Sequence, residues 1–293
     1  MTADAIRLSV IVASHDARGS VADCVASIER QLTPQDELIV VDNSQDGTGQ
    51  IVRDRFRRVR LLSLDPSALV NELWSAGIRA SHGDIVVLTT AHCIPAPDWI
   101  AQVVRAHGAG ATGIGGAIDA EDGSGVIDWA VCFCRYSRFL PPLTNQAVTD
   151  IPADNAAYAR GALLRHEDQW RAGFWEPQVH HALLAEGGQL RLAPEMLVRH
   201  RHSFGFAQFI RERYRHGRQY GGWRATTLTP SRRALHIVAS PLIAPLLLAR
   251  TMQRVLQKGG RTGRLIVAAP ALAAFFLAWA CGEALGYVRG PVR

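Results

Sequence analysis

The chain has 293 residues, enough for one domain of catalytic size and a smaller appendage. Its formal net charge of +6 is too small and too scattered to indicate a nucleic-acid-binding protein, and the excess lies mainly in arginines of the C-terminal third, which suits anionic lipid or a phosphorylated substrate. The five cysteines contain no CxxC pair, so we expect reduced thiols in the core.

The N-terminal region begins with a short apolar run and then alternates between strand-like and helix-like segments. The run Leu8–Ala13 is too short for the hydrophobic region of a signal peptide, so we expect this part of the protein to lie in the cytoplasm. The predicted strands are Leu8–Ala13, Glu37–Val41, Val59–Leu64 and Asp84–Thr90, and the predicted helices are Val21–Gln31, Gly49–Phe56 and Leu69–Ser81.

Continuously apolar strands joined by helices predict an α/β fold with a mostly parallel, Rossmann-like sheet and helices on both faces. In such sheets the ligand lies outside the carboxyl ends of the strands. We therefore expect the residues at the strand ends, Ser14, Asp16, Asp42 and Thr90 to His92, to converge on one pocket. No GxGxxG or GxxxxGK[ST] motif is present, which argues against dinucleotide and P-loop chemistry.

Three segments carry a specific resemblance, namely LSVIVASHDARGSVADCVASI, DELIVVDNSQDGT and SHGDIVVLTTAHCIPAPDWI. In order and spacing they resemble the nucleotide-sugar-binding half of a family 2 glycosyltransferase, which has the GT-A fold. The similarity continues through DNAAYARGAL and LAPEMLVRHRHSFGFAQFIRERYRHGRQYG as far as Gly221.

The resemblance implies roles for several side chains. Asp42, at the end of the second strand, would bind the base of a nucleotide diphosphate-sugar, and the loop from Ser14 to Asp16 would lie against the ribose and base. Asn155 matches a position near the sugar and would hydrogen-bond a sugar hydroxyl, although an asparagine-driven turn is the alternative.

The family's metal-binding Asp-x-Asp motif is replaced here by Thr90-Ala91-His92. One hypothesis is that His92 and His200 bind Mn²⁺, since two histidines make a poor site for Mg²⁺. A second is that no metal is held and that arginines neutralise the diphosphate, the candidates being Arg199, Arg201, Arg213, Arg215 and Arg218. A third is that His92 is a loop residue bonding a backbone carbonyl.

Inverting members of the family use a carboxylate near the start of a helix as the base that deprotonates the acceptor. Counting back from Gly187 places this carboxylate on Glu176, whereas Glu167 and Asp168 precede the Gly173-Phe174 marker and are expected on a solvated helix face. Pro177 suits the first turn of a helix, and a helix N-terminus favours a charged carboxylate. We therefore predict that Glu176 is the catalytic base.

The C-terminal part of the sequence predicts contact with a membrane. Residues 204–220 alternate aromatic and arginine side chains, as in an amphipathic helix at the headgroup level, and Arg215 and Arg218 of this segment would also meet the donor phosphates. The apolar run 234–249 contains two prolines and is expected to be re-entrant or interfacial, whereas 265–288 is expected to span. A two-span hairpin and buried helices of a soluble protein are the alternatives.

The sequence thus predicts a catalytic domain, residues 1–222, followed by a membrane-anchoring segment, residues 223–293. The expected protein is an inverting glycosyltransferase at the cell membrane, with its catalytic domain in the cytoplasm. It would use a nucleotide diphosphate-sugar as donor and a lipid or lipid-linked acceptor, and it would bind no nucleic acid. The alternative is a membrane-bound nucleotide-sugar-binding relative or scaffold that has lost catalysis.

Overall fold

A computed structural model describes residues 7–201 and 205–291. The chain divides into two compact units, one formed by residues 1–121 and 141–203 and the other by residues 122–140 and 204–293. The second unit therefore takes in a segment from the middle of the chain as well as its C-terminal part. The division does not fall at residue 222, and the functional domain boundary placed there stays a prediction. Phe204, the first residue of the predicted interface helix, lies outside the described residues.

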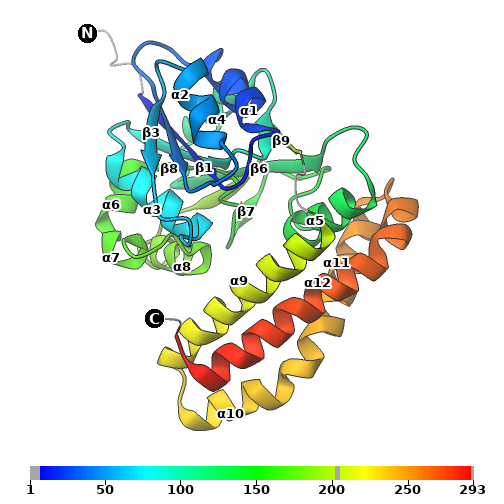
Figure 1. The fold of residues 1–293 in the computed structure, drawn as a ribbon. Coiled ribbons are helices and arrows are strands. Elements are labelled where there is room, and N and C mark those ends of the chain that lie inside the picture. The colour runs from blue at the N-terminus through cyan, green and yellow to red at the C-terminus, as the bar shows by residue number, and fades with distance from the viewer. Residues whose placement is uncertain (1–6, 202–204, 292–293) are drawn as a thin grey trace. The chain divides into compact units, whose positions relative to one another are not determined.

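The first unit is built on one mixed sheet (Figure 1). Its strands, in the described residues, are β1 (Leu8–Ser14), β2 (Glu37–Asp42), β3 (Arg60–Ser63), β4 (Ile85–Thr90), β5 (Cys93–Pro95), β6 (Gly113–Ala120), β7 (Ala147–Val148), β8 (Asn155–Ala159) and β9 (Leu190–His200). The spatial order is β3-β2-β1-β4-β8-β6-β9-β5, with β7 paired to β9.

The first four strands of the sequence form the parallel half of the sheet. β1 pairs with β2 and β4, and β2 pairs with β3, all in the same direction. Every residue of β1 and β4 is buried, as expected for strands covered on both faces. This half confirms the α/β prediction and sets the carboxyl ends of β1, β2 and β4 at one edge.

The second half of the sheet is not purely parallel. β8 runs antiparallel to both β4 and β6, and β6 and β9 are parallel to each other. The short β5 and β7 add to β9 in the antiparallel sense. The antiparallel β8 brings the Asp154-Asn155 turn next to the end of β4, since Thr89 pairs with Asn155.

Helices cover both faces of this sheet (Figure 1). In the described residues of the first unit they are α1 (Val21–Glu29), α2 (Thr48–Arg55), α3 (Val70–Ala80), α4 (Trp99–His107), α6 (Arg160–Arg165), α7 (Glu167–Trp170) and α8 (Glu176–Ala185). The predicted helices near 21–31, 49–56 and 69–81 are thus present. Gly77 of α3 lets the helix lie against Ile11 and Val41, because a Cβ there would overlap Ile11 and press tightly on Val41.

The second unit is helical. Its described helices are α5 (Val126–Tyr136), α9 (Phe206–Thr227), α10 (Pro230–Ala239), a short 3₁₀ turn (Ser240–Leu242), α11 (Ile243–Lys258) and α12 (Thr262–Arg289). The segments Pro230–Lys258 and Thr262–Arg289 are long and apolar enough to cross a membrane by length and composition. They correspond to the two predicted apolar runs.

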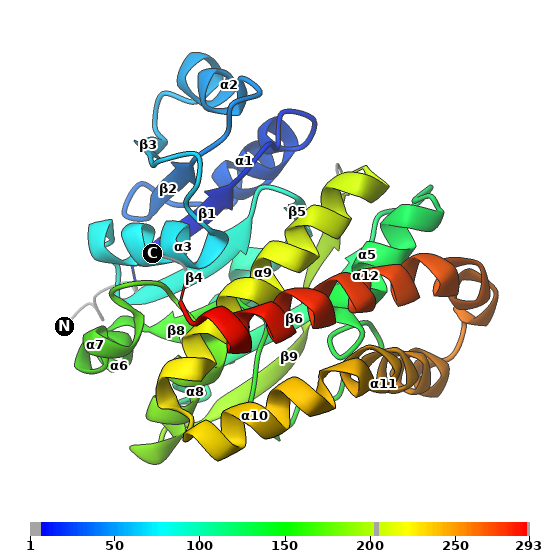
Figure 2. The ribbon, with the colours of Figure 1, turned by 60° about the horizontal axis from the view of Figure 1, so that its bottom comes forward.

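Helices α9 and α12 lie side by side through glycines (Figure 2). Each carries a GxxxG spacing, Gly217 and Gly221 in α9 and Gly282 and Gly286 in α12. A Cβ at Gly217 or Gly221 would collide with the carbonyl oxygens of Trp279 and Glu283, and one at Gly282 would collide with that of Tyr214. Small residues at this spacing allow the backbones to approach closely. Polar α9 and apolar α12 therefore form one packed pair.

Candidate functional site

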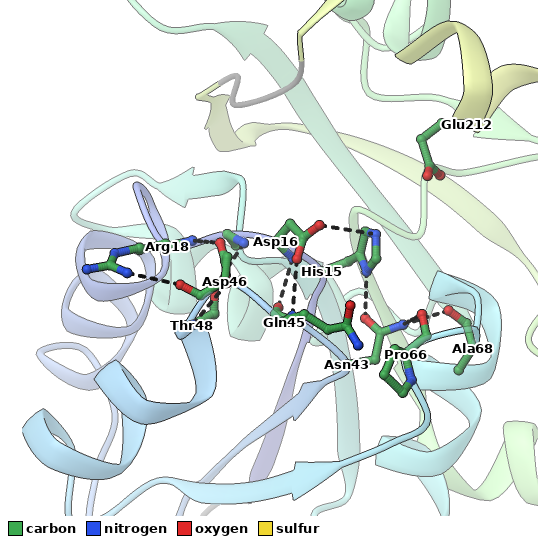
Figure 3. Close-up of polar contacts among 12 residues, drawn as sticks. His15, Asp16, Arg18, Asn43, Gln45, Asp46, Thr48, Pro66, Ala68 and Glu212 are labelled. Atoms are coloured by element: carbon green, nitrogen blue, oxygen red, sulfur yellow. Dashed lines mark hydrogen bonds and ion pairs between the residues drawn. The ribbon is translucent and has the colours of Figure 1, made fainter. Parts of the chain in front are cut away.

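The loops that follow β1 and β2 are joined by hydrogen bonds (Figure 3). The Ser44 hydroxyl donates to Asp42 Oδ1 over 2.5 Å and accepts from the backbone N–H of Asp16 over 2.8 Å. Asp16 Oδ1 in turn accepts from the N–H of Gln45. Asp16 adopts φ +46°, a left-handed conformation that aspartate tolerates better than most residues. The two carboxylates predicted at the strand ends, Asp42 and Asp16, thus belong to one network.

A third loop, after β3, joins the same network (Figure 3). His15 Nδ1 lies 2.9 Å from Asn43 Oδ1, and Asn43 Nδ2 donates to the carbonyl oxygens of Ala68 (2.7 Å) and Pro66 (3.4 Å). Asn43 was not singled out in the sequence, although it directly follows the predicted Asp42. It connects the ends of β1, β2 and β3 into one rim.

The outer edge of the rim is held by Asp46 (Figure 3). Its carboxylate accepts hydrogen bonds from the N–H of Arg18 and from the hydroxyl and N–H of Thr48, while Arg18 Nη1 donates to the Asp46 carbonyl. Partial burial acts to raise the pKa of Asp46, but the hydrogen bonds from Thr48 and Arg18 outweigh it and lower the pKa. Asp46 therefore stays ionised and binds the first loop to the second.

Two strand-end hydroxyls lie in the interior beside this rim. Ser14 is opposite Asp42 in the β1–β2 register, and its buried Oγ has no hydrogen-bond partner in the described part of the chain. Thr90, at the end of β4, donates to Asp154 Oδ1 over 3.3 Å, and Thr89 donates to the Asp154 carbonyl over 2.9 Å. Asp154 thus supplies a buried carboxylate at the end of β4, a feature that the sequence analysis missed.

His92 is bonded within the protein on both ring nitrogens. Nε2 lies 3.2 Å from the His15 carbonyl oxygen, and Nδ1 lies 3.4 Å from Ser20 Oγ. The centres of the His92 and His200 rings are 6.3 Å apart. Both rings are buried, and β5 and β9 bring them together because Cys93 pairs with His200.

The described residues do not assemble an obvious metal site. Within 7–201 and 205–291, no group of three or more histidine, cysteine, aspartate and glutamate side chains is placed to hold an ion. His92 would have to give up a protein hydrogen bond to become a ligand. Metal binding by His92 and His200 therefore stays a prediction.

The Asn155 side chain is buried and hydrogen-bonded within the core. Its Oδ1 accepts from Trp99 Nε1 over 2.8 Å, and its Nδ2 donates to the carbonyl oxygens of Ala117 and Met196, each at 2.8 Å. A Cβ at position 116 would collide with the Asn155 amide and with the Met196 carbonyl oxygen. Gly116 therefore leaves the room that the Asn155 side chain occupies. These three bonds hold the side chain in place, and its predicted hydrogen bond to a sugar hydroxyl stays a prediction.

The candidate arginines differ in what they contact. Arg201 forms ion pairs with Glu121 (2.7 Å) and with Asp23. The hydrogen bonds in these pairs raise the pKa of Arg201 above the usual value of an arginine. Its guanidinium is therefore engaged in joining β9 to β6 and α1. Arg215 and Arg218 belong to α9 in the second unit, where Arg215 pairs with Glu212 at 3.7 Å and Arg218 donates to the Gly290 carbonyl. Their predicted contact with donor phosphates stays a prediction.

Glu176 is the first residue of α8, as the sequence predicts. Its Oε1 accepts a hydrogen bond of 2.9 Å from the N–H of Ala153, in the loop that leads into β8. The start of α8 is held by a cluster of aromatic rings, since Phe174 packs edge-on against Trp74 and Tyr158. The competing pair lies on α7, where Asp168 is exposed and bonds its neighbour Gln169.

A buried chain of three polar side chains lies one turn further along α8. The Tyr158 hydroxyl is 2.8 Å from His180 Nε2, and His180 Nδ1 is 2.9 Å from Asp150 Oδ1. Burial raises the pKa of Tyr158 well above its usual value, and the charges of Glu176 and Asp150 add to this effect. Tyr158 therefore stays neutral, and His180 ties β8 and the loop that precedes it to the helix that carries Glu176.

The spacing of Glu176 and His180 could have revealed this arrangement from the sequence. Residues four apart on a helix share one face, so a glutamate at the helix start predicts that His180 faces the same loop. The partners Tyr158 and Asp150 could not have been found this way, because the antiparallel pairing of β8 was not foreseen.

We predict that His180→Ala lowers the free energy of unfolding by about 2 to 4 kcal/mol, because it leaves the buried Tyr158 hydroxyl unpaired and opens a cavity. The matched control is His181→Ala, since His181 is exposed and should change stability by less than about 0.5 kcal/mol. Chemical denaturation of both variants measures the difference. Equal stabilities would show that the chain through His180 contributes nothing to the fold.

Comparison with known proteins agrees with this geometry. The family model for glycosyl transferase family 2 matches residues 9–166, more than half of the chain. No curated protein matches the sequence significantly.

Solved structures show the same fold. The mannosyltransferase PcManGT from Pyrobaculum calidifontis, in complex with GDP-Man and Mn²⁺, is 18% identical over 95% of this chain and 87% of its own, with a TM-score of 0.54. TarS residues 1–349 from S. aureus, in complex with UDP-GlcNAc, is 13% identical over 95% of this chain and 90% of its own, with a TM-score of 0.55. GalNAc-T7 with UDP, GalNAc and Mn²⁺ is 16% identical over 68% of this chain and 44% of its own, with a TM-score of 0.51. The fold is therefore the GT-A fold, and the chain belongs to glycosyl transferase family 2, a family of sugar-transferring enzymes.

Proposed function

We propose that the protein transfers a sugar, with inversion at the anomeric carbon, from a nucleotide diphosphate-sugar to a hydroxyl or phosphate of a lipid-linked acceptor. The observation that carries the proposal is the rim of loops at the carboxyl ends of β1, β2 and β3, which places Asp42 and Asp16 in one hydrogen-bonded network. Ligands of open α/β sheets bind at this edge.

Asp42 is the residue that we assign to the nucleotide base. Its carboxylate is fixed by Ser44 through one oxygen, while the other lies against Gly49, where a Cβ would come within 2.7 Å. An ionised carboxylate accepts from a base N–H, and both uracil and guanine present one. The related structures carry UDP-GlcNAc or GDP-Man, which agrees with either base.

Glu176 is the residue that we assign to the acceptor. As the acceptor oxygen attacks the anomeric carbon, the Glu176 carboxylate takes the hydroxyl proton, and the bond from that carbon to the diphosphate breaks with its electron pair leaving on the nucleoside diphosphate. The start of α8 favours the charged form of a carboxylate there. A phosphate acceptor is already ionised and would need this proton transfer less.

The leaving diphosphate requires positive charge, and arginines supply it in this proposal. Two of the related structures contain Mn²⁺. If an ion is bound here, His92 and His200 would hold it and it would offset charge on the diphosphate. We derive no step from it, because His92 is already hydrogen-bonded within the protein.

The acceptor is proposed to be lipid-linked, and the catalytic unit to face the cytoplasm at the cell membrane. The two long apolar segments of the second unit support membrane attachment. Basic residues between them, in the segment 250–264, favour the cytoplasmic side. The rival proposal is a nucleotide-sugar-binding scaffold without catalysis, and only the replacement of Asp-x-Asp favours it. Release of nucleoside diphosphate by the protein would distinguish the enzyme from the scaffold.

We predict that Glu176→Gln lowers kcat by at least about a hundredfold while donor affinity changes little, because glutamine keeps the acceptor oxygen for the Ala153 N–H but is not basic. The assay is nucleoside diphosphate release by membranes that contain the variant. The control is Glu167→Gln with Asp168→Asn, which should retain wild-type turnover. Turnover of Glu176→Gln within a few-fold of wild type would remove this residue from the mechanism.

We predict that activity is largely insensitive to Mg²⁺, because the end of β4 offers Thr90 and His92 where hard oxygen ligands are needed. Chelator-treated protein assayed with Mg²⁺ and with Mn²⁺ tests this. His92→Ala should abolish any Mn²⁺ response if His92 is a ligand and change little if arginines act alone. Strong activation by Mg²⁺ would contradict the prediction and direct attention to Asp154, which already bonds Thr90.

A further inference from the structure

The second unit contains a long stretch without acidic residues. From Arg213 to Gly282 the sequence has no aspartate or glutamate, while its basic residues are Arg213, Arg215, Arg218, Arg224, Arg232, Arg233, Arg250, Arg254, Lys258, Arg261 and Arg264. Helices α10 and α11 lie wholly inside this stretch. Such a one-sided charge distribution favours an anionic surface as partner, since each basic group close to anionic lipid is attracted to it.

These two helices and the 3₁₀ turn between them expose large apolar side chains at helical spacing. Leu235, Val238, Leu242 and Leu246 follow one another at spacings of three, four and four residues and are 65%, 77%, 68% and 48% exposed. In water this face of a helix is normally polar. A second exposed stripe runs along α12 through Ile266, Leu277 and Cys281.

The partner of α12 argues against an upright span for that helix. The glycine face of α12 is packed on α9, which carries five arginines. If α12 stood upright across the bilayer, these arginines would lie inside the bilayer beside it. An arginine at the centre of a bilayer is strongly unfavourable, because its charge loses its hydration there.

The C-terminal end of α12 is also in a polar setting. Arg233 donates to the carbonyl oxygens of Tyr287 and Val288, Arg218 donates to that of Gly290, and the Arg213 guanidinium lies 4.4 Å from the centre of the Trp279 ring. The part of α12 that precedes these contacts, residues 265–278, is about 21 Å long at 1.5 Å per residue. A hydrocarbon core is about 30 Å thick, so this part falls short of spanning it.

We propose that the second unit attaches in the plane of an anionic bilayer, with the exposed stripes of α10–α11 and α12 immersed in the boundary between headgroups and acyl chains. The exposed Arg232 of α10 and Arg250 of α11 then meet lipid phosphates. The apolar stripe supplies burial and the acid-free sequence supplies charge complementarity, the two features of an interfacial helix. The inference concerns attachment alone and replaces the upright second span that the sequence predicted.

The first test is sedimentation of the purified full-length protein with vesicles of phosphatidylcholine, with or without phosphatidylglycerol. We expect binding that requires phosphatidylglycerol and weakens with salt. Val238→Glu with Leu242→Glu should lower the association constant of the protein for these vesicles at least about tenfold. Burial of the two apolar side chains contributes more than about 1.4 kcal/mol, the free energy that corresponds to this factor. The matched control is Val104→Glu on α4 of the first unit, 38% exposed, which should bind as wild type. Equal binding of the double variant, or no preference for the anionic lipid, would overturn the proposal.

The second test separates in-plane attachment from spanning. In a Cys281→Ser background, Gly263→Cys and Arg289→Cys place thiols at the two exposed ends of α12. A membrane-impermeant maleimide is added to right-side-out and to inverted vesicles. Labelling of both thiols from the same side is expected, and labelling from opposite sides would show that α12 spans. Neither test measures sugar transfer, so failure here is distinct from failure of the proposed reaction.

Discussion

The parallel pairing of β1 with β2 is the constraint on which the candidate site depends. It sets Ser14 opposite Asp42, and the N–H of Asn43 extends the ladder by donating to the Ser14 carbonyl over 3.1 Å. The loops that leave the two strands therefore start side by side, and a few short side chains suffice to join them. Ser44, Asn43 and Asp46 do this through hydrogen bonds, so that the carboxylates are held before any ligand arrives.

A second constraint fixes the proposed base. The antiparallel β8 carries Tyr158 under α8, and the preceding loop carries Asp150 and Ala153, so one strand and one loop meet Glu176 and His180 on a single helix face. Buried polar groups that are fully bonded specify one arrangement, because any shift would leave a donor or an acceptor without a partner. The same logic applies to Asn155, which is held next to the end of β4 by its bonds to Trp99, Ala117 and Met196.

The sequence was informative where local pattern decides structure. Apolar runs and helical spacing placed β1 to β4 and α1 to α3, and Pro177 with the spacing from Gly187 placed Glu176 at a helix start. The pattern could not foresee β8, because an antiparallel strand inserted into a parallel sheet depends on contacts distant in sequence. For that reason Asp154, Tyr158 and Asp150 went unassigned. The helix near 204–220 was found, but its packing on α12 became visible only through the paired glycines.

The central claim is that the rim beside Asp42 binds a nucleotide diphosphate-sugar. Calorimetric titration of the protein with UDP- and GDP-sugars, repeated with Asp42→Asn and with Asp54→Asn as an exposed control on α2, tests it most directly. The account predicts binding of one nucleotide class, a loss of at least about tenfold in affinity for Asp42→Asn because a charged hydrogen bond is lost, and no change for Asp54→Asn. Unchanged affinity in Asp42→Asn would contradict it.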